Sequence, residues 1–320
     1  MHYNHAVKWL KSFRHSPEAI CAMYADDFLF EDVMLDQRGI TDKGDLHRLF
    51  VPYANTDPDN GVGIHNFRIR SYIGTPRRGL IRWEWSPKHA GVFLGVDVAG
   101  KPFSTQGHTW HEYDENGLIT RESSWWDAAA VFRQTGPVHP TTSLTGTKGT
   151  ATASADGAGP AGFAPANGME HASRWCAALG GDVDALGTLY ADWFTLEDTF
   201  VEDHLVDTVT DRTMLAEKFG AMAAGENGTY TFTPTEYLAG DGPYGLIHWT
   251  VSVEDATTFR GIPTGGRTVT TIGSTFHQFD EQGKIVLEST HWEDNQALVQ
   301  LGIPIGRPHY WEEGFDPTAG

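Results

Sequence analysis

The feature that most constrains this chain is an internal repeat with a constant offset of 166 residues. Residues 24–32 (YADDFLFED) return as residues 190–198 (YADWFTLED), and residues 79–83 (GLIRW) return as residues 245–249 (GLIHW). Glu122, Ser123 and Trp126 return in the same way as Glu288, Ser289 and Trp292. A period of this length indicates two copies of one domain, because solenoid repeats are much shorter.

Length and charge agree with two ordinary globular domains. The chain has 320 residues, and a typical domain has roughly 150. Its 42 acidic and 23 basic residues give a net charge of −19, which repels phosphate groups and anionic lipids. We therefore expect no nucleic-acid partner and no membrane partner. Two cysteines, Cys21 and Cys176, fit a reducing, cytoplasmic location better than a disulfide framework.

The segment between the copies has a different composition. It is rich in Thr, Ser, Gly, Ala and Pro and poor in large apolar side chains, which is typical of a flexible linker. The sequence thus predicts a first domain over 1–137, a linker over 138–168, a second domain over 169–304 and a tail over 305–320.

The first copy shows helical spacing first and strand-like runs afterwards. Residues 6–13 have helical spacing, Ser16 precedes a second helix to about residue 24, and Asp42 caps a third. Strand-like runs are at 28–35, 63–73, 78–86, 91–98 and 102–113, and the turn at 114–117 leads into a last strand at 118–126. The second copy repeats this order. Helices followed by a sheet built from hairpins are typical of an α+β fold.

This order, with the strand YADDFLFED and the ending DENGLITRESSWWD, resembles the nuclear transport factor 2-like superfamily. The ending of the second copy, residues 292–302, is similar to that of SnoaL-like polyketide cyclases. The superfamily also includes ketosteroid isomerase and limonene epoxide hydrolase. The resemblance implies two tandem cone-shaped domains, each a curved antiparallel sheet wrapped round three helices, with an apolar pocket and no cofactor.

Two pairs of carboxylates are candidates for acid/base chemistry. By the resemblance, Asp32 and Asp198 take the position of a general base, although such an acid can also bond loop amides. Glu122 and Glu288 lie on the last strand of each copy, where strand alternation places them on one face with the Trp four residues later. A register error of one residue would move both glutamates to the outer face.

Other positions depart from the known relatives. The isomerase's oxyanion-hole positions correspond to Trp9 and Thr109, and to Trp175 in the second copy, so ketosteroid isomerisation is not expected. Arg82 and Glu84, with Glu122, resemble the epoxide-opening set of limonene epoxide hydrolase, and a solvent-facing ion pair is the alternative.

We expect the following side chains to line the pockets and bind substrate: Trp9, Tyr24, Phe50, Trp83, Thr109, His111, Trp126, Trp175, Tyr190 and Trp292. The 15 histidines form no metal-binding pattern, so no metal is expected.

Three functions remain open from the sequence. The first is a cofactor-independent isomerase, cyclase or dehydratase that acts on a small hydrophobic metabolite. The second is an epoxide hydrolase that uses Arg82, Glu84 and Glu122, and the third is a binding or structural module without catalysis. Fusion of two copies predicts a monomeric pseudo-dimer, and the first copy, which keeps more ionisable groups, is expected to carry the chemistry.

Overall fold

The computed structural model describes residues 2–32, 37–51, 65–93, 96–135, 167–198 and 209–303. These residues form two units, domain 1 (residues 2–135) and domain 2 (residues 167–303), and each is described by itself. The predicted linker and tail lie almost entirely outside the described residues, so their boundaries stay predictions. Within the described residues, none of the helices is both long enough and apolar enough to cross a membrane.

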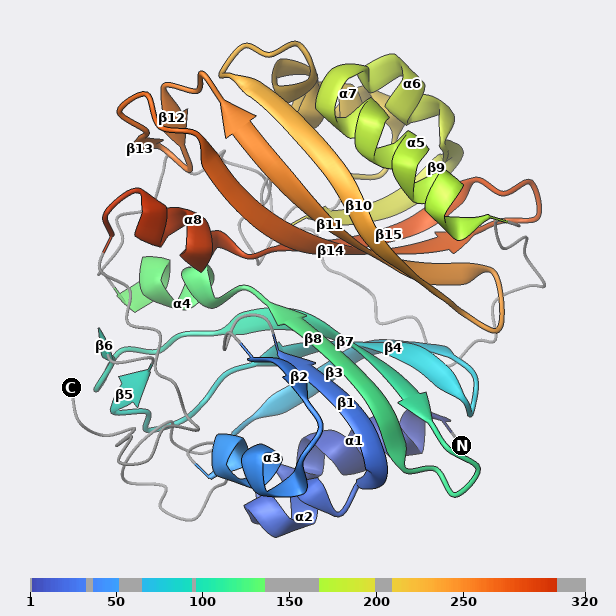
Figure 1. The fold of residues 1–320 in the computed structure, drawn as a ribbon, viewed down its shortest axis with the longest axis vertical. Helices are drawn as coiled ribbons and strands as arrows, with labels where there is room; N and C mark the ends of the chain where they lie inside the picture. Colours follow the sequence, from blue (N-terminus) through green and yellow to red (C-terminus); the bar gives the residue numbers. More distant parts are fainter. Residues whose placement is uncertain are drawn as a thin grey trace. The chain divides into compact units, whose positions relative to one another are not determined.

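Three helices cover one face of the domain 1 sheet (Figure 1). They are α1 (His2–Ser12), α2 (Pro17–Cys21) and α3 (Lys43–Phe50). The Ser16 side chain caps α2 by accepting from the Ala19 amide, and Asp42 caps α3 by accepting from the Gly44 and Asp45 amides. Apolar residues at helical spacing, such as Leu46, Leu49 and Phe50 on α3, are buried, so each helix packs by one face.

The domain 1 sheet has six strands in the order β2-β1-β8-β7-β4-β3. The first and last long strands, β1 and β8, pair in parallel, and the other neighbours pair antiparallel. The sheet is therefore mixed, since it contains one parallel pair of strands among antiparallel pairs. Its strands are β1 (Tyr24–Asp32), β2 (Gln37–Ile40), β3 (Phe67–Gly74), β4 (Arg78–Trp85), β7 (Thr105–Tyr113) and β8 (Ile119–Trp126).

Three elements differ from the sequence prediction. The first strand begins at Tyr24, four residues early, because its amino end pairs with β8. The predicted strand over 91–98 is instead a small hairpin of β5 (Val92–Phe93) and β6 (Val96–Asp97), which forms its own two-stranded sheet. A further helix, α4 (Ala128–Thr135), follows β8 and was not predicted.

Domain 2 repeats the plan. Its helices α5 (Gly168–Gly181), α6 (Val183–Thr188) and α7 (Arg212–Ala223) cover one face of a sheet ordered β10-β11-β14-β15-β9 (Figure 1). Again the first and last long strands, β9 and β15, pair in parallel. The strands are β9 (Tyr190–Asp198), β10 (Thr229–Ala239), β11 (Tyr244–Glu254), β14 (Val269–Phe279) and β15 (Ile285–Trp292), with β12 (Thr258–Phe259), β13 (Ile262–Pro263) and α8 (Asp294–Gln300) outside this sheet.

A glycine in each sheet leaves room for a large indole close to the strand. A Cβ on Gly107 would come within 2.5 Å of Trp83 and 2.7 Å of the Trp126 Cβ. A Cβ on Gly273 would collide with the Trp249 ring. These glycines therefore serve close packing, since no side chain fits between the strand and the indole.

Candidate active site

A buried glutamate on the last strand is the centre of a hydrogen-bond network in domain 1. The Tyr24 hydroxyl donates to Glu122 Oε2 at 2.5 Å, and His111 Nε2 lies 2.8 Å from the same oxygen. The Ser124 hydroxyl donates to Glu122 Oε1 at 2.8 Å. An ionised carboxylate can accept all three of these hydrogen bonds. The network thus satisfies a carboxylate whose side chain is only 2% exposed.

Two further groups connect this glutamate to its neighbours. The Trp83 indole donates to Thr109 Oγ1 at 3.0 Å, and Thr109 Oγ1 lies 2.9 Å from Ser124 Oγ. Because Ser124 donates its single hydroxyl proton to Glu122, the Thr109 hydroxyl donates to Ser124 and accepts from the indole. On the other side, His111 Nδ1 lies 3.0 Å from the Tyr113 hydroxyl. Burial and the Glu122 charge raise the pKa of Tyr24 well above its usual value, so Tyr24 remains a donor.

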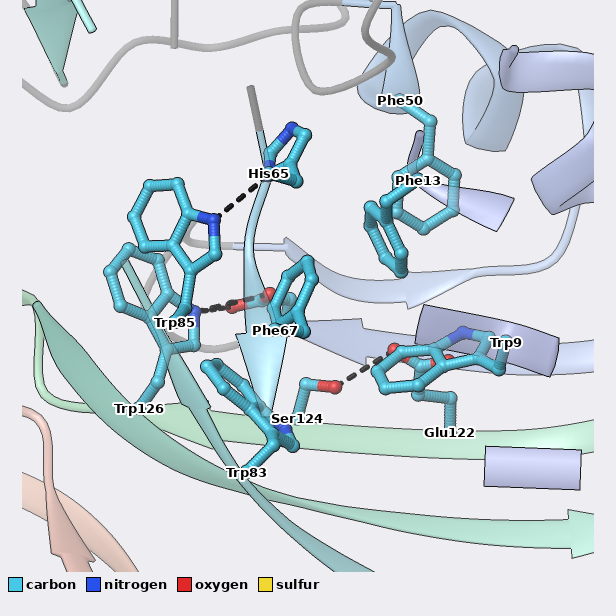
Figure 2. A pocket seen from close by; sticks show the side chains of 11 residues that line it. Trp9, Phe13, Phe50, His65, Phe67, Trp83, Trp85, Glu122, Ser124 and Trp126 are labelled. Atoms are coloured by element: carbon cyan, nitrogen blue, oxygen red, sulfur yellow. Dashed lines mark hydrogen bonds between the residues drawn. The ribbon is translucent and has the colours of Figure 1, made fainter. Parts of the chain in front are cut away.

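A cavity opens beside this network. Its volume is about 60 Å³, and most of its walls are aromatic rings. Figure 2 shows Ser124 pointing toward Glu122, with the rings of Trp83 and Trp9 on either side. The described residues that line it are Trp9, Phe13, Asp32, Phe50, His65, Phe67, Trp83, Trp85, Glu122, Ser124 and Trp126.

A second carboxylate, Asp32, lines the same cavity from the end of β1. The Trp126 indole donates to both of its oxygens, at 3.0 and 3.3 Å. Asp32 is half-buried, whereas Glu122 is fully buried. The parallel pairing of β1 with β8 places Asp32 opposite Ser124, two residues from Glu122. The cavity therefore has two carboxylates at different depths, supported by different donors.

Domain 2 repeats the glutamate network. Glu288 accepts from Tyr190 at 2.5 Å and from Thr290 at 2.9 Å, and it lies 2.8 Å from His277 Nε2. Burial raises the pKa of Glu288 to about 7. The chain from Trp249 through Thr275 to Thr290 matches the chain from Trp83 to Ser124.

One partner in the network differs between the copies. His277 Nδ1 lies 2.9 Å from His171 Nε2, whereas the matching His111 faces the Tyr113 hydroxyl. Burial lowers the pKa of His171 to about 2 and that of His277 to about 3. Both imidazole rings are therefore neutral at ordinary pH, and each carries a single N–H. One of these N–H groups forms the hydrogen bond between the two rings.

Aromatic rings pack more closely at the matching place in domain 2. The ring centroids of Trp249 and Trp292 are 4.8 Å apart, and Phe232 lies 5.3 Å from Trp249 and 5.6 Å from Trp292. All three side chains belong to the buried core of the domain. Asp198, the counterpart of Asp32, is only 2% exposed.

The structure brings together most of the side chains predicted for the first pocket. Tyr24 and His111 contact the glutamate of the cavity, and Thr109 contacts Ser124. The predicted residues that line the cavity are Asp32, Glu122, Trp9, Phe50, Trp83 and Trp126. In domain 2, Trp175 donates to Tyr190, and Tyr190 donates to Glu288, as in domain 1.

The structure does not place Arg82 and Glu84 at the cavity. They alternate with Trp83 and Trp85, whose side chains line it, so they lie on the opposite face of β4. Arg82 donates to Ser71 at 3.4 Å, and Glu84 forms ion pairs with arginines of β3. The predicted set of Arg82, Glu84 and Glu122 is therefore divided between the two faces of the sheet.

Several side chains of the cavity and of the glutamate network were not predicted from the sequence. Phe13, His65, Phe67 and Trp85 complete the aromatic wall, and His171 completes the network of domain 2. The repeat contained a signal for the histidines, because His5 and His111 return as His171 and His277 at the same offset. No group of three or more His, Cys, Asp or Glu side chains suited to a metal ion occurs among the described residues.

Comparison with known proteins gives a match in each half. The SnoaL-like polyketide cyclase profile matches residues 6–135, and the SnoaL-like domain profile matches residues 172–288. No match is found among curated proteins.

Solved structures resemble a single domain of this chain. One is a hypothetical protein with a ketosteroid isomerase-like fold from Catenulispora acidiphila, in complex with trimethylamine; it is 20% identical, with a TM-score of 0.35, over 45% of this chain and 97% of its own. IdmH, a proposed polyketide cyclase from Streptomyces antibioticus, is 20% identical, with a TM-score of 0.35, over 42% of this chain and 96% of its own. The epoxide hydrolase/cyclase-like enzyme SalBIII is 20% identical, with a TM-score of 0.31, over 38% of this chain and 86% of its own.

Proposed function

Since the chain belongs to the SnoaL-like family, with one such domain in each half, we propose that domain 1 is an acid/base enzyme acting on a small hydrophobic metabolite. The reaction class is isomerisation, cyclisation or dehydration without a cofactor. The observation that carries the proposal is that two carboxylates, Asp32 and Glu122, line one aromatic cavity. The aromatic walls suit an apolar substrate, and the carboxylates supply the proton-transfer groups.

Asp32 has the role of general base. Asp32 lines the cavity, and the Trp126 indole on β8 donates to both of its oxygens. A fixed carboxylate that reaches a bound substrate can remove a proton from carbon next to a carbonyl group. The half-buried position also allows Asp32 to exchange protons with solvent between turnovers.

Ser124 has the role of accepting a hydrogen bond from a hydroxyl group of the substrate, because its own proton goes to Glu122 Oε1. Ser124 also lines the cavity, so a substrate hydroxyl bound there is connected to the buried network. Tyr24 and His111 keep Glu122 in one orientation by contacting its other oxygen. The substrate would thus lie between Asp32 on β1 and Ser124 on β8.

Proton exchange at carbon tests this assignment without knowledge of the natural substrate. We suggest 2-tetralone, a small aromatic ketone, in D₂O, with deuterium incorporation followed by NMR. The wild-type protein is expected to exceed the buffer rate, and Asp32→Asn to lower the catalysed rate roughly 100-fold or more. Asp198→Asn makes the matched change in domain 2 and is expected to keep the rate.

The same experiment separates catalysis from binding alone. If the ketone binds but exchanges no faster than in buffer, or if Asp32→Asn keeps full activity, the base assignment is wrong. Circular dichroism of each variant shows whether the fold is retained.

A further inference from the structure

Every formally charged side chain among the described residues of the domain 1 cavity is acidic. Asp32 and Glu122 supply these charges. The remaining titratable side chain in the wall, His65, accepts a hydrogen bond at Nδ1 from the Trp85 indole at 2.9 Å. Because an indole nitrogen can only donate, Nδ1 carries no proton, and His65 is neutral in this arrangement. The polar part of the wall therefore favours positive charge.

The aromatic part of the wall has the same preference. Phe67 and Trp85 lie nearly parallel, at 29°, with centroids 6.3 Å apart. Trp83 meets Phe67 at 81°, and Trp126 meets Trp85 at 73°. These rings contact one another, and all four line the cavity. Aromatic faces carry negative electrostatic potential, and an organic cation enclosed by several of them is stabilised.

We propose that the ligand of this cavity carries a cationic nitrogen enclosed by hydrocarbon, as in a tertiary or quaternary alkylammonium group. This rests on the proposed function only in using the same cavity, and it adds the class of substrate. The cation lies among the indole and phenyl rings within reach of Asp32. The two carboxylates would repel an anionic ligand, and a neutral hydrocarbon would gain apolar contact without the electrostatic attraction.

The overall charge of the protein also favours a positively charged ligand. A net charge of −19 raises the local concentration of cations around the molecule. The cavity itself gives the selection, because desolvated charges at short range are less screened by salt than surface charges.

Two ligands of the same shape test the proposal with the full-length protein. Phenyltrimethylammonium and tert-butylbenzene differ by the replacement of a charged nitrogen with carbon, so their apolar contact is the same. We expect phenyltrimethylammonium to bind at least about tenfold more tightly, as measured by calorimetry or tryptophan fluorescence. Asp32→Asn is expected to reduce the preference to about threefold or less, and the matched Asp198→Asn to leave it unchanged.

The wild-type measurement alone can overturn the proposal. Equal or tighter binding of tert-butylbenzene, or no binding of the cation below about 10 mM, contradicts a cation site. If the folded Asp32→Asn variant still binds the cation more tightly than tert-butylbenzene to the same degree, the rings alone select the cation. The role proposed for Asp32 in this selection is then wrong. Binding requires no turnover, so this test can succeed while proton exchange fails, or fail while proton exchange succeeds.

Discussion

The two domains share a hydrogen-bond network but differ in the space beside it. In both, a buried glutamate accepts from a tyrosine on the first long strand and contacts a histidine on the neighbouring strand. In domain 1 the rings next to this network surround a cavity that Asp32 reaches. In domain 2 the rings of Phe232, Trp249 and Trp292 lie within 5.6 Å of one another.

One difference in the wall follows from a single strand position. Phe67 pairs with Trp85 in domain 1, and Phe232 pairs with Val251 in domain 2. Trp85 and Val251 therefore take the same place in the sheet, and domain 2 has the smaller side chain there. The glutamate network is therefore kept in both copies while the wall beside it changes.

The largest expected effect is on packing of the two equivalent tryptophans. Trp292→Ala removes a ring packed against Trp249 and Phe232, and we expect a loss of about 3–5 kcal/mol in the free energy of unfolding of domain 2. Trp126→Ala, the matched change, enlarges an existing cavity and should cost domain 1 less. Calorimetric unfolding measures both, and equal losses would contradict the contrast in packing.

The second expected effect concerns the glycines under the indoles. Gly273→Ala would force a methyl group against the Trp249 ring, and Gly107→Ala would force one against Trp83 and Trp126. We expect a loss of about 1–3 kcal/mol in each domain by calorimetry. Gly220→Ala is a suitable control, because a Cβ there meets no atom within 4 Å. A loss as large in the control would remove the steric explanation.

The third expected effect is a dependence of the stability of domain 2 on pH. Burial raises the pKa of Glu288 in the folded state to about 7 from an ordinary 4.5, so the folded protein holds this proton more tightly than the unfolded chain. The resulting stability is present below about pH 4.5 and is lost as the pH rises toward 7. His171 and His277 act in the opposite direction, since their pKa values are lowered and stability is lost as the pH falls below 6.5.

Glu288→Gln separates these contributions. The stability of the wild type minus that of the variant should fall by about 2 kcal/mol between pH 5 and pH 7, because one pKa unit corresponds to about 1.4 kcal/mol. Denaturant unfolding of domain 2 at each pH gives this difference. A difference that stays flat, or rises with pH, would contradict a raised pKa for Glu288.

The fold and part of the site could be predicted from the sequence. The constant offset of 166 residues located both domains, and strand alternation placed Glu122 on the face of Trp126. The strand register agrees, because Glu122 pairs with His111 and Trp126 pairs with Gly107 on β7. These inferences depend on local spacing, which the sequence contains directly.

Long-range pairing could not be predicted in the same way. Tyr24 reaches Glu122 because β1 and β8 pair in parallel, although the two residues are 98 positions apart. Strand alternation also does not say which face of β4 is inside, and Trp83 and Arg82 necessarily lie on opposite faces. The structure places the indole at the cavity, and Arg82 on the other face is also covered, at 8% exposed against 6% for Trp83.

The smallest expected effect is on stability, at a strand position that holds a tryptophan in domain 2 and an aspartate in domain 1. It tests whether the exposure of this position explains why both residues are tolerated. Trp193 on β9 is 70% exposed, and its counterpart on β1 is the exposed Asp27. We expect Trp193→Asp to change the stability of domain 2 by less than about 0.5 kcal/mol, because an exposed ring has little apolar contact to lose. The reverse change, Asp27→Trp, should be equally mild in domain 1. A loss above about 1 kcal/mol from Trp193→Asp alone would show that this indole is covered in solution, and the contrast with the buried Trp292 would then no longer rest on exposure.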